Sequence, residues 1–361
     1  MDFISSSELF SPAAIAAYWT EATSNRIPYL GEAFFPARQK AGLDLSWIKG
    51  NKGVPVSLKP STFDAKATFR DRIGVKKINT EMPFFREGFK LKEKDRQEIL
   101  RALDATDPYV REVIARVFDD AQNLIEGAMV VPERMIMQLL FAIDGEMGIS
   151  IKANGVDYTY EYDANDDWKG TNYFALEGTA LWSASNANTA DPFKDIQTAK
   201  DAVAAKGGIT RYLVMNTTTF NLLRSIKAVQ NRFITVSGVA VGYPSNSEIK
   251  QVLTDTLDLE DIIVYDKQYK DEAGVTHKFV PDGYVSLLPE GQLGNTWRGT
   301  TPEEADLMDK KSNAVVSVVE NGIAITQEVT AHPVNVNTYA SEIVLPSFER
   351  MDEVALLKVT A

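Results

Sequence analysis

The feature that most constrains the fold is one apolar stripe that extends over residues 108–143. A capping residue followed by proline at 106–108 is a typical helix start, and apolar residues then recur at spacings of three and four. A helix of this length would be about 50 Å long at 1.5 Å per residue. Pro132 lacks an N–H group and, together with Gly127, predicts a bend in one long helix. A break into two helices is the alternative.

The residues before this stripe have too few periodic apolar positions to fold alone. Residues 1–42 combine one short helix, expected over 11–22, with irregular sequence. Residues 54–60 and 65–73 alternate approximately between polar and apolar, which predicts a hairpin. A hairpin that buries so little apolar surface is marginal in water, so we expect it to lie on another surface.

Residues 70–101 are locally basic in a chain whose formal net charge is −12. This segment is either a solvated charged face or a surface that docks onto an acidic neighbour. Its interleaved aromatic residues are more typical of interface anchors or core than of nucleic-acid stacking. The candidate contacts with a neighbouring subunit are Phe63, Phe69, Arg70, Arg72, Lys76, Lys77, Phe84, Phe85 and Arg86.

Beyond Gly148 helices and strands mix without regular βαβ order, which predicts an α+β fold. Helices are expected to start at Asp191-Pro192, to cover 220–233, and to start again with Asn246 or Ser247 as the cap. Asn154-Gly155 and Asn321-Gly322 suit the tight turns of two hairpins. Further strands are expected at 211–216, at 261–269 paired with 275–280, and at 283–289, 340–346 and 353–359.

The composition excludes most catalytic chemistry. The chain has no cysteine and only two histidines, His277 and His332, and it lacks phosphate-loop, dinucleotide and nucleophile-elbow motifs. Residues 163–174 begin like a calcium loop but place Trp168 where glycine is required and Phe174 where a glutamate belongs. We therefore predict no catalytic, cofactor-binding or metal-binding residues, and a protein that is not an enzyme.

Charge and length indicate the class of protein. The net charge of −12 argues against general affinity for nucleic acid, yet it would suit a wall that holds a polyanion without adhering to it. The first residues lack a secretory signal, and the apolar stretch at 135–143 is about half the roughly 20 residues that span a bilayer. The 361 residues suffice for two domains of a soluble, cytosolic product.

Three stretches resemble one protein family. Residues 220–233 resemble a helix with aromatic, basic and Lys-Ala-Val positions in that order. Residues 262–299 resemble a strand, a tyrosine-bearing hairpin, a Phe-Val-Pro-Asp turn and a further strand, and 107–129 resemble a helix that opens with Asp-Pro. Together with the order of elements, they resemble the major capsid protein of tailed bacteriophages, in particular the lambda E-type family.

The resemblance implies the Hong Kong 97 phage capsid-type fold. In that fold the long helix is the spine of a peripheral domain, and an axial domain surrounds the local five- or six-fold axes. The arm and the extended loop would lie over neighbouring subunits. The implied parts are an N-terminal arm (1–42), an extended β-hairpin loop (43–90), a peripheral domain (91–190 and 296–361) with spine helix 108–143, and an axial domain (191–295).

The resemblance further implies a structural protein that self-assembles as pentamers and hexamers into the icosahedral shell of a phage head. The shell would enclose double-stranded DNA without sequence-specific binding, and would form in the host cytoplasm as a precursor that expands. The implied partners are a scaffolding protein, a portal and, optionally, a decoration protein, with no cofactor and no membrane. An encapsulin-type shell around an enzyme cargo is the alternative within this fold. An enzyme is the alternative outside it, which a convergent set of titratable groups in one pocket would favour.

Overall fold

The structure is a computed structural model, and the chain divides into two compact units. It describes residues 11–22, 28–49, 76–91, 108–153, 155–233, 244–309, 315–319, 322–331 and 334–361. The predicted strands at 54–60 and 65–73 lie outside these residues. Unit 1 comprises Met1–Leu45, Asn79–Glu133 and Asn295–Ser347, and unit 2 comprises Ser46–Ile78, Arg134–Gly294 and Phe348–Ala361.

Unit 1 is built on a six-stranded sheet around the long strand β16 (Val334–Phe348). Strand β16 pairs with β15, with β13 and with β4. Residues Phe84–Leu91 of β4 run antiparallel to residues 336–343 of β16. The predicted hairpin around residues 321–322 is confirmed, because Val319 pairs with Ile323. The remaining elements are β1 (Ala37–Gln39), β13 (Gly294–Arg298), β14 (Val315–Val319), β15 (Ile323–Ala331), α3 (Leu30–Phe34) and α11 (Pro302–Asp309).

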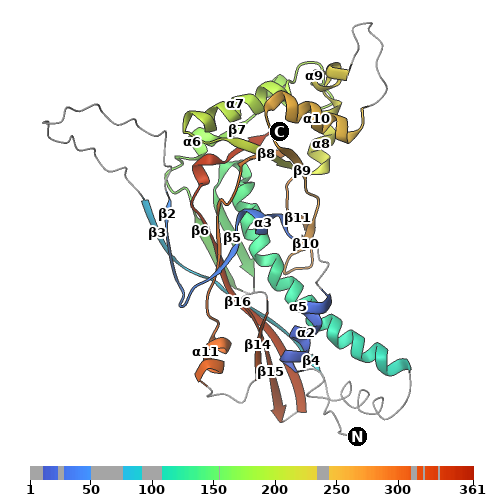
Figure 1. Cartoon of the computed structure of the whole chain (residues 1–361), viewed down its shortest axis with the longest axis vertical. Helices are drawn as coiled ribbons and strands as arrows, with labels where there is room; N and C mark the ends of the chain where they lie inside the picture. The colour runs from blue at the N-terminus through green and yellow to red at the C-terminus, as the bar shows by residue number, and fades with distance from the viewer. Residues whose placement is uncertain are drawn as a thin grey trace, which may run out of the picture. The chain divides into compact units, whose positions relative to one another are not determined.

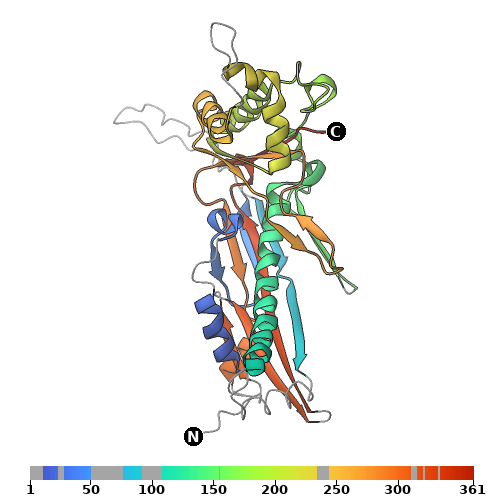
Figure 2. The same cartoon turned by 90° about the vertical axis from the view of Figure 1, so that its right-hand side faces the viewer.

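Two helices cover this sheet, α2 (Pro12–Ala22) and the long α5 (Pro108–Leu140). They lie side by side in Figure 1 and Figure 2, and their apolar faces share one core with β14, β15 and β16. The helix expected in the N-terminal arm is confirmed, and it packs on the sheet of its own chain. That core contains Ile15, Trp19, Ala121, Ile125, Met129, Val319, Ile323, Ile325 and Ala340.

The long helix α5 is continuous through Pro132. Pro132 is buried, and the next residue, Glu133, accepts a hydrogen bond from the backbone N–H of Gly31 at 2.9 Å. One helix is therefore present where two were the alternative, and the bend near Gly127 stays a prediction. The helix ends at Leu140 and not at residue 143, because the chain then enters a short 3₁₀ turn.

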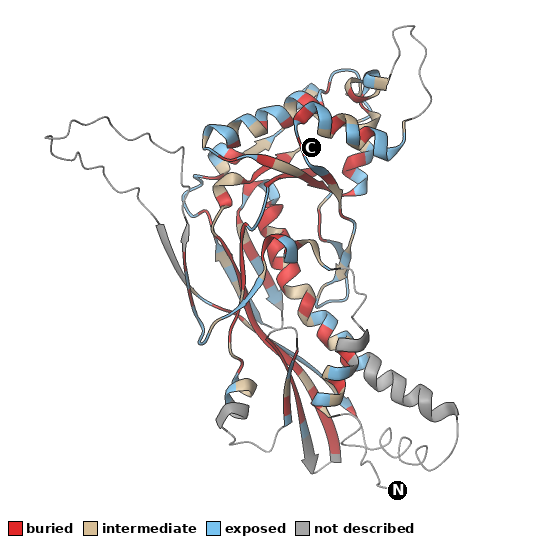
Figure 3. Cartoon of the chain, in the orientation of Figure 1, coloured by how far each residue is buried: buried red, intermediate tan, exposed pale blue. Residues whose placement is uncertain are grey.

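Unit 2 is built on a five-stranded sheet in the order β7-β17-β12-β8-β9. All residues of the central strand β12 (Tyr284–Pro289) are buried. Helices lie over this sheet, and Figure 3 shows buried residues on the helices as well as on the strands. The other strands are β7 (Tyr173–Ala175), β8 (Thr210–Met215), β9 (Asp261–Val264) and β17 (Ala355–Lys358). The helices are α6 (Lys169–Asn172), α7 (Pro192–Ala205), α8 (Thr217–Ser225), α9 (Lys227–Gln230) and α10 (Asn246–Leu257).

Three short two-stranded sheets complete the described elements. The hairpin predicted around residues 154–155 is confirmed as a pair of strands that place Ala153 opposite Val156. The pairs are β2 (Asp44–Lys49) with β3 (Lys76–Glu81), β5 (Gly148–Ala153) with β6 (Val156–Glu161), and β10 (Gln268–Lys270) with β11 (Thr276–Lys278).

Three local predictions in unit 2 were wrong. The helix expected over 220–233 is interrupted at Ile226, whose backbone is extended and whose side chain enters the core. The cap of α10 is Ser245 and not Asn246 or Ser247, because Ser245 forms a reciprocal capping box with Glu248. The strand expected over 261–269 is two strands, of which only the second pairs across the predicted tip, whereas β9 lies parallel to β8.

Candidate functional site

The predicted subunit contacts fall within residues 63–86 of the sequence, and the structure describes part of them. Phe63, Phe69, Arg70 and Arg72 are outside the described residues, as are the side chains of Lys76 and Lys77 on β3. Phe84, Phe85 and Arg86 begin β4, where the two phenylalanines are half-buried and the arginine is exposed. Their role between subunits stays a prediction.

Arg86 has partners within its own chain. Its guanidinium lies 4.9 Å from the centre of the Phe84 ring and forms an ion pair with Glu303, the second residue of α11. Glu303 also accepts a hydrogen bond from the Ser341 hydroxyl at 3.0 Å. The Arg86 side chain is 45% exposed and the Glu303 side chain 12%, so this partly exposed pair anchors Arg86 to its own chain.

A buried ion pair lies in the same sheet of unit 1. Arg298 Nη1 and Glu342 Oε2 are 2.8 Å apart, and the two side chains are only 5% and 1% exposed. Among the described residues, Nε of Arg298 and Oε1 of Glu342 have no hydrogen-bond partner. Burial raises the pKa of Glu342 to about 7, although the positive charge of Arg298 opposes the rise.

A polar cluster follows the end of the long helix, within unit 2. Asp144 has a φ of 52°, which is uncommon for a residue other than glycine. Its carboxylate accepts hydrogen bonds from Lys358 Nζ at 2.7 Å and from the Tyr284 hydroxyl at 3.3 Å. The lysine hydrogen bond and charge lower the pKa of Asp144. The 3₁₀ turn after α5 is thereby connected to β12 and β17.

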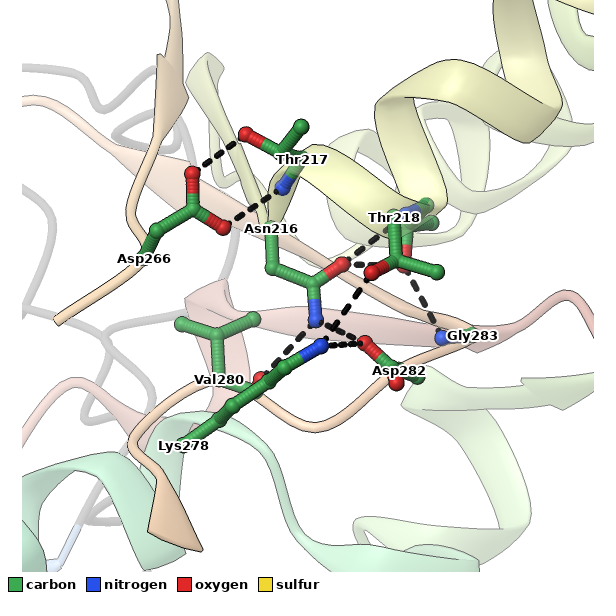
Figure 4. Close-up of polar contacts among 9 residues, drawn as sticks. Asn216, Thr217, Thr218, Asp266, Lys278, Val280, Asp282 and Gly283 are labelled. Carbon is green, nitrogen blue, oxygen red and sulfur yellow. Dashed lines mark hydrogen bonds and ion pairs between the residues drawn. The ribbon is translucent and has the colours of Figure 1, made fainter. Parts of the chain in front are cut away.

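Asn216 organises the turn that carries the Phe-Val-Pro-Asp sequence (Figure 4). Its Oδ1 atom accepts a hydrogen bond from Thr219 N at 2.8 Å and so caps α8. Its Nδ2 atom donates to Val280 O at 3.0 Å and to Asp282 Oδ1 at 2.6 Å. Asn216 is fully buried, so water does not compete for these hydrogen bonds. Its single side-chain amide therefore fixes both the start of α8 and the turn at 279–283.

Further bonds close this turn. Asp266 accepts from the backbone N–H of Thr217 at 2.9 Å, and Gly283 N donates to the Thr219 hydroxyl at 2.9 Å. Lys278 Nζ donates to Asp282 Oδ1 at 2.7 Å. The sequence predicted the Phe-Val-Pro-Asp turn but not the role of Asn216 in holding it. An asparagine between a buried strand and a helix is a recognisable capping signal.

Replacing Asn216 by alanine is expected to lower the free energy of unfolding by about 2–3 kcal/mol. The change removes the cap of α8 and leaves the Val280 carbonyl without its donor. Urea unfolding of the unassembled chain measures the loss. Thr217→Ala is the matched control, because it removes only the exposed hydroxyl contact with Asp266 and should cost less than about 1 kcal/mol. Equal losses in the two variants would contradict the assigned role.

The described residues give no sign of a metal site or a membrane span. No group of three or more histidine, aspartate or glutamate residues is placed to hold a metal ion in the part of the chain that the structure describes. Within the same residues, no helix is both long enough and apolar enough to cross a bilayer.

Solved structures with this arrangement of elements are phage-related and capsid proteins. A prophage capsid protein from Escherichia coli CFT073 is 13% identical, has a TM-score of 0.60, and is aligned over 97% of this chain and 99% of its own. A phage-related protein from Bordetella bronchiseptica RB50 is 14% identical, with a TM-score of 0.55 and 95% of each chain covered. The capsid of cyanophage A-1(L) is 13% identical, with a TM-score of 0.51 over 93% of this chain and 94% of that one. The fold is therefore that of phage capsid proteins of the Hong Kong 97 type.

The family follows from the sequence as a whole. The model of the family described as phage major capsid protein E matches residues 11–359. The chain belongs to this family, and its role is that of a structural capsid component. No curated protein matches the chain. The resemblance stated from three stretches of sequence is confirmed for both family and fold.

Proposed function

We propose that this chain self-assembles as pentamers and hexamers into the icosahedral shell that encloses the DNA of a phage. The observation that carries the proposal is the family match over residues 11–359. A unit with a long helix on a long sheet and a second unit with a five-stranded sheet support it. In the proposal the first provides the peripheral domain and the second contains the axial domain.

The mechanism is assembly through many modest contacts. In a closed ring each subunit presents one surface to one neighbour and a different surface to the other. Contacts that are weak singly become effective because every subunit makes several of them at once. The residues predicted as the extended loop, 43–90, and the basic segment 70–101 would contribute to such contacts.

The proposal extends to partners and to the place of assembly. A scaffolding protein and a portal would act during assembly, and a decoration protein is an optional further partner. The precursor shell would form in the host cytoplasm, expand on packaging, and become part of the virion. The acidic chain would enclose DNA without adhering to it, because a net charge of −12 disfavours general attachment to phosphates. The proposal includes no sequence-specific binding.

Negative-stain electron microscopy of the purified chain tests the proposal. We expect closed shells, or five- and six-membered rings, when the chain is concentrated alone or mixed with a scaffolding partner. Shell size and the presence of packaged DNA in particles from infected cells distinguish a phage head from a compartment for an enzyme. Compact particles of one or two subunits under all of these conditions would contradict the proposal.

A further inference from the structure

Two segments of unit 2 carry charge of one sign each. Residues 217–233 contain three basic residues and no acidic one, whereas 251–261 contain four acidic residues and no basic one. The basic group lies before the helix α10 in the chain, and the acidic group begins in its last turn at Asp255. The basic end is defined by Arg224, Lys227 and Arg232, and the acidic end by Asp255, Asp258, Glu260 and Asp261.

The basic end lies at the start of α10. Arg224 Nη1 donates to Asn246 Oδ1, at the first residue of α10, over 3.1 Å. Arg232 stacks on Phe193 at the start of α7, with 4.9 Å from its guanidinium carbon to the ring centre. Lys227 and Arg232 are exposed. The closest acid along the chain, Glu248, is already engaged in the capping box with Ser245.

The acidic end lies at the other end of α10. Asp258 follows the last turn of the helix, and Glu260 N donates to Arg211 O at 2.8 Å at the start of β9. All four carboxylates belong to exposed residues. Among the described residues, Arg211 lies 3.3 Å from Asp258, and Lys200 donates to the backbone carbonyls of Leu257 and Asp258 at the end of α10. The hydrogen bond to Glu260, helped by the surrounding negative charges, raises the pKa of Tyr212 to about 12.

The two ends are separated by the length of the helix. Twelve residues at 1.5 Å per residue span about 18 Å, which exceeds the Debye length of roughly 8 Å at physiological salt. The two groups therefore neutralise each other weakly within one chain. The carboxylates also lie at the C-terminal end of α10, where the helix dipole disfavours negative charge. Cations brought from outside the chain would relieve both effects.

We propose that the basic end of one copy meets the acidic end of the next copy, head to tail, within a ring of subunits. A second copy fits because the same chain carries both charges, and a ring brings unlike surfaces together. Two-fold pairing can also bring unlike ends together, so the ring is taken from the proposed capsomer and not from charge alone. The exposed Ile209, two residues before Arg211, supplies apolar surface beside the acidic end. This inference rests on the proposed assembly into capsomers.

Charge reversal of each end tests the inference. One variant carries Lys227→Glu and Arg232→Glu, the other carries Asp255→Lys and Asp261→Lys, and all four side chains are exposed. We expect each variant to need at least about tenfold more protein than the wild type for assembly, measured by light scattering and electron microscopy. The protein with all four substitutions should recover, because its two ends are complementary again.

A one-to-one mixture of the two variants gives a sharper result. Copies of the first variant are acidic at both ends, whereas copies of the second keep one basic end and carry at the other two lysines beside Asp258 and Glu260, with Arg211 3.3 Å from Asp258. The two kinds of copy can alternate, so six-membered rings should return while five-membered rings should not. The matched control for the basic-end variant is Lys152→Glu with Lys270→Glu, which lowers net charge by the same amount at exposed residues outside both ends and should assemble normally. Recovery in the mixture shows that the variants are folded.

The outcomes separate this inference from the proposed function. If the wild type forms shells and each reversed variant assembles as readily, the pairing of the two ends is wrong while the capsid role stands. If neither the mixture nor the fourfold variant recovers although both variants keep wild-type circular dichroism, the pairing is also wrong. If the wild type itself never assembles, the proposed function fails first.

Discussion

Replacing Arg298 by methionine is expected to lower the free energy of unfolding by about 3–5 kcal/mol at pH 8. The substitution removes the partner of Glu342, whose side chain is only 1% exposed and lies 2.8 Å from the guanidinium. An unpaired buried carboxylate is far more costly than the intact pair is favourable. Urea unfolding of the unassembled chain, followed by tryptophan fluorescence, measures the change.

The loss should shrink in acid. Burial raises the pKa of Glu342 from 4.5 to about 7, so the folded chain holds this proton more tightly than the unfolded chain does. The corresponding stability, about 3 kcal/mol, is fully present below about pH 4.5 and is lost as the pH rises through 7. Below pH 4.5 Glu342 is neutral in both the folded and the unfolded chain. Arg298→Met then leaves no unpaired buried carboxylate, so the loss of stability is smaller.

A double substitution provides the control. Arg298→Met with Glu342→Leu removes both charges and should be as stable as the wild type or more stable, because buried pairs seldom repay their desolvation. Its stability should also lose the pH dependence between 4.5 and 7. An Arg298→Met protein with wild-type stability at pH 8, or a loss that grows in acid, would contradict the role assigned to the pair.

Sequence patterns predicted the elements whose causes are local. The long helix follows from apolar spacing, and the 153–156 hairpin from a two-residue turn signal. The cap at Asp191 could be predicted because its partner lies in the first turn of the same helix: the Asp191 side chain accepts a hydrogen bond from Lys194 N. Even here the local choice failed once: Ser245 competes with two neighbouring capping residues, and only the capping box with Glu248 decides between them.

The polar sites could not be predicted because their partners are distant in the sequence. Arg298 and Glu342 are 44 residues apart, and Asn216 and Asp282 are 66 apart. Periodicity gives the face of a strand but not the strand that will lie beside it. The interruption at Ile226 has the same origin, since it places a side chain in a core shared with other elements of unit 2.

The largest effect on assembly is expected from the extended loop, and the structure sharpens the deletion that tests it. Removing all of 43–90 would also remove most of β4, which pairs with residues 336–343 in the sheet of unit 1. Deleting 50–75 spares that strand. Met82 N donates to Leu43 O at 2.9 Å at one end of the β2–β3 pair. The two strands therefore run antiparallel, and a tight Asn-Gly turn can join residues 49 and 76.

The chain without residues 50–75 is expected to fold with nearly wild-type stability and to form no closed shells. The deleted residues include four of the predicted subunit contacts, Phe63, Phe69, Arg70 and Arg72, and few apolar positions for a core of their own. Loss of contacts that every subunit repeats acts on all interfaces at once, so closure fails even where each contact is weak. Thermal unfolding and electron microscopy separate the two expectations. A glycine-serine segment of equal length is the control for chain length and should also fail, and normal shells from either protein would remove the loop from the assembly mechanism.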